Sequence, residues 1–447
     1  MGRMLSLRRS AFAAGFSVLF ACDAAEETAP SCEQAVVLPP PDEAFILGLA
    51  GVPQGTFGAA DAPDFEGGFN KLADHGFNQF VPVFLTNESG AGTEELTYFL
   101  PASATGVSEE LSCTGERNPW TASARMKVVL PGYLLVPEVA PSEPLESALV
   151  SERMQGFVTS CLGGDEALLG GVYLQDEPAN NYAGSSLDSD PDNDFRLENV
   201  AVLAEGTRAV VDAPVMLVEA PMPYFVSYFG FEPELEKQVL ERWDEGVAVT
   251  APSADVYGFD YYAVDLTEDF GVSAQVVEEG IAAAPKAKPI AVVQGFGYAD
   301  MGIEFPTSTG RRPTPEEVRV NAFTVVAAGA EGVFWYGQSA LTLEDPDQSL
   351  WQAMQGVAEE LRKLSGTFAL PRIEGEVGNA KVLVRAHADE AASYWLVVNP
   401  TNQDQPIQLA GEGALTDSLS GELVTEGELS TMLKPYQVAT YRRAKCQ

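Results

Sequence analysis

The chain has 447 residues, and its 65 acidic side chains against 26 basic ones give a formal net charge of −39 with only two histidines. Such a field repels nucleic acid, because nucleic-acid affinity comes chiefly from basic residues that neutralise phosphate. A histidine-rich metal site or a Ser-His-Asp triad would have to be built from His75 or His387. At 46% hydrophobic and 9% aromatic residues, the chain is too apolar to be an acidic disordered polymer, and it is long enough for one large domain and a small one.

The first 22 residues indicate an export signal. Three arginines precede an uncharged, largely apolar run over residues 11–21 that ends at Cys22. A membrane-spanning helix needs roughly 20 such residues, so the pattern predicts a secretory signal peptide and not an anchor helix. Leu19-Phe20-Ala21-Cys22 resembles the lipobox of bacterial lipoproteins. This resemblance implies an exported chain, lipidated at Cys22 and anchored in the bacterial cell envelope, with cleavage at a nearby alanine as the alternative.

Four cysteines remain after Cys22, and an even number in an exported protein is most simply two disulfides. We expect Cys113 to pair with Cys161, and Cys32 to pair with Cys446. Four free buried thiols are the alternative.

The middle of the chain alternates short apolar runs with longer amphipathic stretches. An acidic, proline-rich tether over residues 23–42 precedes this region, which extends from residue 43 to about residue 370. The alternation is typical of βα units around a parallel sheet. Eight strands over about 290 residues favour a (β/α)8 barrel over an open doubly wound sheet, and no Gly-x-Gly-x-x-Gly follows the first strand. The predicted strands are Phe45–Ala50, Phe77–Leu85, Lys127–Leu135, Leu168–Gln175, Val215–Glu219, Val256–Tyr261, Ile290–Gln294 and Gly332–Tyr336.

Residue patterns also mark two helix ends. Thr314, Pro315 and Glu317 form the pattern of an N-cap, a first-turn proline and a capping-box glutamate. His75 and Gly76 precede the second predicted strand and indicate a helix end with a glycine cap. We therefore expect His75 to lie at that helix end and outside catalysis.

After about residue 370 the helical pattern ends. Residues 371–447 contain strand-like runs separated by turn residues, which predicts a small all-β domain, most simply a sandwich that packs against the barrel. The predicted strands are Lys381–Ala388, Ser393–Asn399, Pro406–Ala410 and Gln437–Arg442.

The residues that close the barrel strands are the candidates for chemistry, because the active site of such a barrel lies at the carboxyl ends of its strands. Asp176 and Glu177 follow the apolar run of the fourth predicted strand and directly precede Pro178. We expect these two carboxyl groups to belong to the site, and a solvated acidic turn is the alternative. The other strand ends supply Glu219, Asp260, Tyr261, Gln294, Trp335 and Tyr336.

This mixture suits chemistry on sugars. A glycosidic bond breaks through an oxocarbenium-like transition state, which needs a carboxylic acid to protonate the leaving oxygen and a negative charge to stabilise the ring. Aromatic side chains such as Trp335 and Tyr336 stack on the C–H face of a pyranose, and amides such as Gln294 bond its hydroxyls. We expect Glu219, Tyr261, Gln294, Trp335 and Tyr336 to bind substrate, although only alternate members of Phe334-Trp335-Tyr336 can face the barrel interior.

On these residues the sequence resembles a glycoside hydrolase-like (β/α)8 barrel with an appended β-sandwich. The resemblance rests on four segments, which are His75-Gly76-Phe77-Asn78, Gln175-Asp176-Glu177-Pro178, Gly329–Tyr336 and Lys434-Pro435-Tyr436-Gln437-Val438. In the large retaining clan, the fourth strand ends in Asn-Glu-Pro with the Glu as acid/base, so the resemblance implies that Glu177 is the acid. Asp176 replaces the clan's Asn, and Gln294 stands where the clan has its nucleophilic Glu.

This departure leaves three interpretations open. Asp260 or Glu219 serves as the nucleophile, or as the base of an inverting reaction. Alternatively, Asp176 orients an acetamido group of the substrate that attacks in place of the enzyme, as in substrate-assisted hexosaminidases. In the third, the barrel binds a glycan without cleaving it. The predicted function is therefore an exported lipoprotein glycoside hydrolase with Glu177 as the general acid, and a non-catalytic glycan-binding surface lipoprotein is the alternative.

An acidic loop over Asp188–Asp194 places carboxylates at every second residue, a spacing that can bind Ca²⁺. Asn193 and Asn199 stand where an EF-hand needs Gly and Glu. We therefore expect a solvated loop and no cofactor, with Ca²⁺ as a minor alternative.

Overall fold

The computed structural model describes residues 37–53, 56, 64–81, 125–136, 142–185, 196–226, 231–302, 309–337, 341, 343–375 and 377–445. The predicted signal peptide, the lipidation site Cys22 and the acidic loop Asp188–Asp194 lie outside these residues and stay predictions. Within the described ranges, no helix is both long and apolar enough to cross a membrane.

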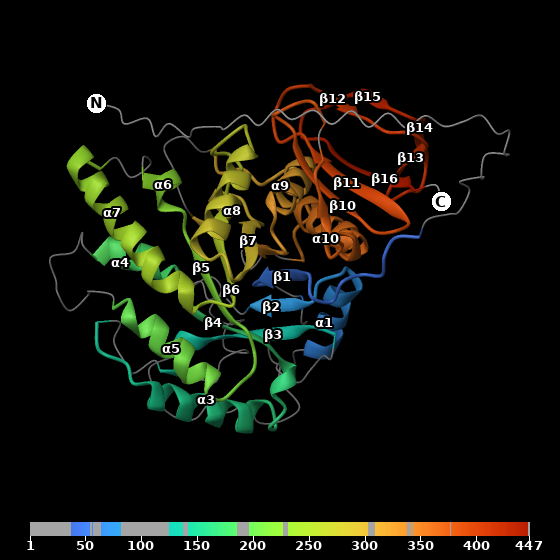
Figure 1. Ribbon diagram of the computed structural model, residues 1–447. Helices are drawn as coiled ribbons and strands as arrows, with labels where there is room; N and C mark the ends of the chain where they lie inside the picture. Colours follow the sequence, from blue (N-terminus) through green and yellow to red (C-terminus); the bar gives the residue numbers. More distant parts are fainter. Residues whose placement is uncertain are drawn as a thin grey trace.

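Eight parallel strands close into a barrel in sequence order, with β8 paired to β1. They are β1 Ile46–Ala50, β2 Gln79–Val81, β3 Lys127–Pro131, β4 Leu169–Asp176, β5 Val215–Glu219, β6 Val256–Tyr261, β7 Lys288–Gln294 and β8 Gly332–Tyr336. Figure 1 shows the helices arranged around the outside of these strands. The predicted (β/α)8 barrel is confirmed.

The third predicted strand is wrong in its second half. Residues Gly132–Leu135 form the 3-10 helix η2 instead of extending β3. Pro131 ends the strand because proline has no N–H to donate to the ladder.

Nine α-helices lie among the described residues. They are α1 Phe65–Asp74, α3 Ser147–Cys161, α4 Pro178–Ser185, α5 Glu198–Arg208, α6 Met222–Phe225, α7 Pro233–Thr250, α8 Gly271–Ala283, α9 Pro315–Ala328 and α10 Ser349–Phe368, and the other 3-10 helices are η3 Glu166–Leu168, η6 Ala251–Ser253 and η7 Tyr298–Met301. The predicted capping box of Thr314 and Glu317 begins α9. As predicted, α1 ends just before His75, with Gly76 at φ +96°, and Nδ1 of His75 lies 2.7 Å from the Glu359 carboxylate of α10.

The barrel has two apolar layers, because successive side chains of a strand point to opposite faces. Met216, Val292 and Phe334 belong to the cluster inside the barrel. Leu217 follows Met216 in the sequence, and Trp335 follows Phe334. Both belong to the larger apolar cluster between the strands and the helices. Which face a strand residue takes therefore decides whether it can reach a site inside the barrel mouth.

The C-terminal residues form two antiparallel sheets. One has the order β14-β13-β16-β11-β10-β9, and the other pairs β12 with β15. Apolar side chains from both sheets form one cluster, which includes Val397, Leu415, Ile407 and Leu433, and this arrangement confirms the predicted small all-β sandwich. The strands are β9 Arg372–Ile373, β10 Leu383–Ala388, β11 Ala392–Val398, β12 Gln405–Leu409, β13 Ala414–Asp417, β14 Leu423–Glu426, β15 Leu429–Leu433 and β16 Val438–Ala444.

The sandwich packs against the barrel, beside α9 and α10 (Figure 1). The Arg385 guanidinium on β10 donates to the carbonyl oxygens of Val326, in the last turn of α9, and of Ala330, just after that helix, each at 2.9 Å. The loop after β6 also contacts the sandwich, because the N–H of Phe270 donates a hydrogen bond to the carbonyl oxygen of Pro400 at 3.0 Å.

Cys161 is the one cysteine among the described residues. It is buried at the end of α3 and is disulfide-bonded. All other cysteines lie outside the described ranges, so the pairings of Cys161 with Cys113 and of Cys32 with Cys446 stay predictions.

Candidate active site

A pocket of about 380 Å³ opens at the carboxyl ends of the barrel strands. Three carboxyl side chains line it, those of Asp176 and Glu177 after β4 and that of Asp260 on β6. No Lys, Arg or His of the described residues is among its lining side chains. The described lining of the pocket therefore carries a net charge that is negative or zero.

Glu177 and Asp260 both line the pocket, and the charge of Glu177 helps to raise the pKa of the Asp260 carboxyl group. Oδ2 of Asp260 accepts a hydrogen bond from the Tyr262 hydroxyl at 2.8 Å. Oδ1 of Asp260 is buried and receives no hydrogen bond from an N–H or hydroxyl group of the described residues. Oε2 of Glu177 accepts from Nδ2 of Asn180 at 2.7 Å. The pair thus has a defined geometry and one oxygen without a fixed donor.

Burial raises the pKa of both carboxyl groups. For Glu177, desolvation is the largest cause, and the charge of Asp176 adds to it. For Asp260, desolvation and then the charges of Glu177 and Asp176 hold the pKa well above its ordinary value. Like charges at close range oppose double ionisation, so the pair retains a proton to higher pH than ordinary carboxyl groups do.

Asp176 reaches the pocket through an irregularity in the sheet. The register between β4 and β5 shifts between Tyr173 and Asp176, and such bulges turn a side chain out of simple alternation. The Tyr173 hydroxyl donates to Oδ1 of Asp176 at 2.5 Å. The Asp176 side chain is exposed through the mouth of the pocket, yet desolvation by the surrounding protein raises its pKa, while the bond from Tyr173 lowers it.

Aromatic rings form one wall of the pocket. Tyr262 and Tyr336 stack with their ring centroids 5.5 Å apart, and Phe296 meets Tyr262 edge-on at 5.1 Å. The Tyr298 hydroxyl donates to the carbonyl oxygen of Tyr262 at 2.7 Å, so the residues after β7 hold the end of β6 in place. This wall offers apolar ring faces next to the carboxyl groups.

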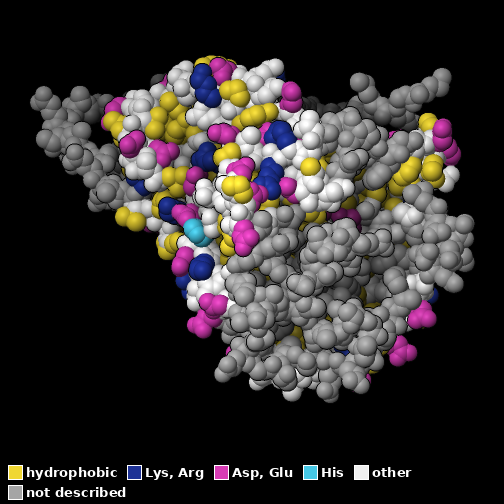
Figure 2. All heavy atoms as spheres, turned by 180° about the vertical axis from the view of Figure 1, so that it is seen from behind, with side chains coloured by type: hydrophobic (Ala, Val, Ile, Leu, Met, Phe, Trp, Pro, Cys, Tyr) yellow, Lys and Arg dark blue, Asp and Glu magenta, His cyan; other side chains and the backbone are white. Residues whose placement is uncertain are grey.

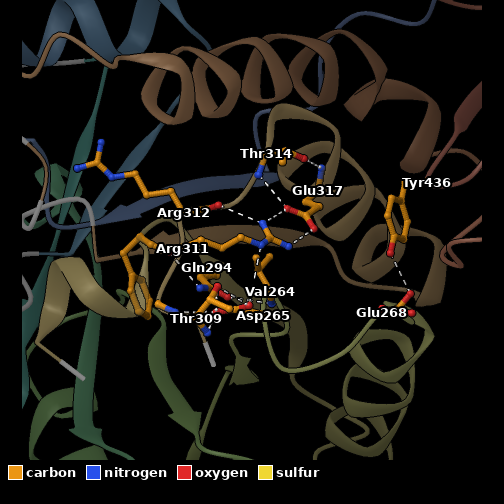
Figure 3. A network of polar contacts seen from close by, with 12 residues as sticks. Val264, Asp265, Glu268, Gln294, Thr309, Arg311, Arg312, Thr314, Glu317 and Tyr436 are labelled. Atoms are coloured by element: carbon orange, nitrogen blue, oxygen red, sulfur yellow. Dashed lines mark hydrogen bonds and ion pairs between the residues drawn. The ribbon is translucent and has the colours of Figure 1, made fainter. Parts of the chain in front are cut away.

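A polar network ties the loops after β6 and β7 together (Figure 3). Asp265, at φ +70°, accepts hydrogen bonds from the N–H groups of Thr309 at 2.6 Å and Gly310 at 2.8 Å. Arg311 forms an ion pair with Glu317 at 2.6 Å. The network holds in place the segment that carries Phe296 and Tyr298.

Glu219 and Gln294, which were predicted to bind substrate, are not among the residues that line the pocket. Glu219 is fully buried and accepts a hydrogen bond from the N–H of Ala179 at 2.9 Å, because its position on β5 faces the helices. The side-chain amide of Gln294 hydrogen-bonds to the backbone. Its oxygen accepts from the N–H of Val264, and its nitrogen donates to the carbonyl oxygen of Phe296, both at 3.0 Å.

Tyr261 and Trp335, which were also predicted to bind substrate, are likewise not among the residues that line the pocket. Both occupy strand positions that face the helices. Tyr261 packs on Phe225 with ring centroids 5.5 Å apart, and Trp335 meets Phe77 edge-on at 5.8 Å. Of the predicted residues, the structure brings together Asp176, Glu177, Asp260 and Tyr336.

Most of the lining residues were not predicted as part of the site, and four of them are Tyr262, Phe334, Asn180 and Phe296. Tyr262 lies two residues after Asp260, and Phe334 lies two residues before Tyr336, so strand alternation could have identified both. Asn180 lies three residues after Glu177, one turn along α4. Phe296 follows the end of β7, and no local pattern marks it.

Within the described residues, no group of three or more His, Cys, Asp or Glu side chains could hold a metal ion.

Known structures share the architecture of this chain. An α-amylase from Geobacillus thermoleovorans, complexed with acarbose, is similar over 90% of this chain and 99% of its own, with a TM-score of 0.52 and 10% identity. A GH30 endoxylanase from Clostridium papyrosolvens is similar over 91% and 98%, with a TM-score of 0.44 and 12% identity. No protein-family model and no curated protein sequence matches the chain. At such identities the likeness shows the fold alone, and that fold is a (β/α)8 barrel of the kind found in glycoside hydrolases.

Proposed function

We propose that this chain is a glycoside hydrolase in which Glu177 is the general acid and Asp260 is the nucleophile. One observation carries the proposal. The two carboxyl groups come from the ends of different strands and line one pocket at the carboxyl ends of a (β/α)8 barrel. The aromatic wall of Tyr262 and Tyr336 supports it, because ring faces pack on the C–H face of a sugar.

The proposed roles of the pair predict retention of configuration. Inverting enzymes separate their two carboxyl groups by about 6.5–9.5 Å to admit a water molecule, and retaining enzymes by about 5–5.5 Å. With Asp260 as the nucleophile, the proposed mechanism requires the shorter of these separations.

The proposed reaction has two steps. A carboxylate oxygen of Asp260 attacks the anomeric carbon while Glu177 gives its proton to the leaving glycosidic oxygen, so that one C–O bond forms as the other breaks. Glu177, now ionised, then takes a proton from water as that water attacks the anomeric carbon and releases Asp260. The Tyr262 hydroxyl and the Asn180 amide hold one oxygen of each carboxyl group throughout.

The substrate is a neutral or cationic sugar rather than a sugar acid. Among the described residues, three carboxyl groups and no basic side chain line the pocket, so a substrate carboxylate would be repelled by these groups. We also propose that the chain is exported and anchored through Cys22, as the lipobox-like sequence suggests. Loss of membrane association and of labelling by a palmitate analogue in Cys22→Ser would support the anchor.

Asp176 favours a second candidate mechanism. Its side chain is held by Tyr173 beside Glu177, where it could orient a substrate acetamido group that attacks in place of Asp260. In that mechanism hydrolysis requires a 2-acetamido sugar, and Asp260→Asn keeps much of its activity.

The test compares Glu177→Gln with Asp260→Asn on aryl and alkyl glycosides. A general acid matters most for poor leaving groups, so Glu177→Gln should lower kcat/KM on alkyl glycosides by about 10²–10⁴-fold and spare activated dinitrophenyl glycosides. Asp260→Asn should abolish hydrolysis of both, and proton NMR should find the retained anomer. The opposite pattern would exchange the two roles, and unchanged hydrolysis in Glu177→Gln would refute the proposal.

A further inference from the structure

Glu219 is a fully buried carboxyl group that does not touch the pocket. Its Oε2 accepts a hydrogen bond from the N–H of Ala179 at 2.9 Å. Its Oε1 accepts from the Thr250 hydroxyl of α7 at 3.1 Å. These donors are neutral, so no ion pair offsets its burial. Burying a carboxyl group without a cation is unfavourable, which makes this position unexpected if Glu219 were only a packing residue.

The backbone group that Glu219 binds is the first N–H group of α4, a helix that begins directly after Glu177. The N–H groups in the first turn of a helix have no partner within the helix, and a carboxyl group is a favourable acceptor for them. Glu219 therefore attaches the start of α4 to the end of β5. It performs from a neighbouring strand the role that an N-cap residue usually performs within the chain.

The turn between β4 and α4 is strained at the proposed acid. Glu177 has φ +42°, a left-handed conformation that side chains other than glycine rarely adopt. Such a conformation persists only where surrounding contacts enforce it. The N–H of Glu177 donates to Val218 at 3.2 Å, and its carbonyl oxygen accepts from Asn181 at 2.9 Å. Glu219 supplies a further contact at Ala179, one residue beyond Pro178.

The same turn sets the side chain of Glu177. Asn180, which follows Ala179 in the first turn of α4, donates through Nδ2 to Oε2 of Glu177 at 2.7 Å. If the first turn of α4 shifts, both the backbone of Glu177 and its amide partner move. Displacements of about 1 Å in a catalytic group lower rates substantially.

We propose that Glu219 is a positioning residue, which fixes the first turn of α4 and thereby holds Glu177 toward Asp260. The inference rests on the proposed function, in which Glu177 is the acid. It assigns to Glu219 a role in proton transfer without contact with substrate.

The test is the leaving-group dependence of Glu219→Gln. The glutamine has the same shape but places an NH₂ group where one of the carboxyl oxygens accepts hydrogen bonds. We expect kcat on alkyl glycosides to fall about 10–100-fold, with KM changed less than about threefold and with dinitrophenyl glycosides hydrolysed at nearly the original rate. Thr250→Val removes only the hydroxyl donor and should show the same pattern more weakly. This variant tests the proposal if Glu219→Gln does not fold.

Asp255→Asn is the matched control. Asp255 accepts a hydrogen bond from the N–H of Val215 at 3.0 Å, at the opposite end of the strand that Glu219 closes. Asp255→Asn should lower the stability of the chain without changing the ratio of the rates on alkyl and dinitrophenyl glycosides. An equal fall on both substrates in Glu219→Gln, while Glu177→Gln shows its leaving-group effect, would overturn the positioning role alone. If Glu177→Gln shows no such effect, the proposed function and this inference are both refuted.

Discussion

Asp260 and Glu177 make the stability of the chain depend on pH. Their pKa values are raised in the folded chain, chiefly by burial. Between the ordinary carboxyl pKa of about 4 and the raised values, the folded chain binds more protons than the unfolded chain does. Stability is then fully present at low pH and falls as pH rises through this window. These two groups therefore oppose folding at neutral pH.

Asp260→Asn should raise the free energy of unfolding at pH 7, because an amide of the same size removes the buried charge. The gain should be about 1.4 kcal/mol for each pKa unit by which Asp260 is raised, and it should vanish near pH 4. Urea denaturation at the two pH values measures it. A loss of stability at pH 7, or a gain that is the same at both pH values, would contradict this explanation.

Helix α4 approaches α7 closely because α7 has a glycine at the contact. A Cβ atom added to Gly246 would lie 2.8 Å from Cα of Ala179, the residue whose N–H binds Glu219. Since Ala179 Cα belongs to the backbone, the contact could be relieved only if α4 moved. Packing of these two helices thus sets the position of the turn that carries Glu177.

Gly246→Ala should destabilise the chain despite the better helix propensity of alanine. The propensity gain is about 1 kcal/mol, whereas overpacking a buried contact costs about 1–3 kcal/mol. Gly156→Ala in α3 is the control, since its Cβ would have no neighbour within 4 Å, and it should be neutral or stabilising. Equal free energies of unfolding for the two variants, from denaturant titration, would count against the packing argument.

Strand limits could be predicted from the sequence, but strand faces could not. The predicted limits of β5, β6 and β8 agree with the structure residue for residue, because apolar runs between polar turns mark buried strands. The face was mistaken at Tyr261 and Trp335, since a run that is apolar on both sides gives no sign of which side is inside. The bulge before Asp176 and the residues after β7 depend on neighbouring strands and loops, which no local pattern records.

The sandwich was predicted only in part for a similar reason. Its four predicted strands correspond to β10, β11, β12 and β16, while β9, β13, β14 and β15 were missed. β14 is largely exposed, and β9 has two residues. Neither has the buried alternation that distinguishes a strand from a loop.

The charge of the whole molecule should make its stability depend on salt. Basic side chains can neutralise at most 26 of the 65 acidic ones, and Figure 2 shows acidic side chains spread over the visible face rather than gathered in one patch. The remaining repulsion acts against the compact state. Ion pairs such as Arg311 with Glu317 oppose this trend, but they are few beside the surplus.

We therefore expect the melting temperature at pH 7 to rise as NaCl is increased from 0.01 to about 0.15 M, as the Debye length shortens from about 30 to about 8 Å. Near pH 4 the rise should be much smaller, because many carboxylates are then protonated. Differential scanning calorimetry at both pH values measures it. A melting temperature that falls with salt at pH 7 would show that ion pairs outweigh repulsion.

The loop after β6 connects the wall of the pocket to the C-terminal sandwich. It begins beside Tyr262 in the pocket wall, and farther along, Glu268 accepts a hydrogen bond from Tyr436 of the sandwich at 3.1 Å (Figure 3). One short segment thus serves the pocket and the C-terminal sheets together. The two parts are not interchangeable modules, and a chimaera that exchanges the sandwich would have to carry its own version of this loop.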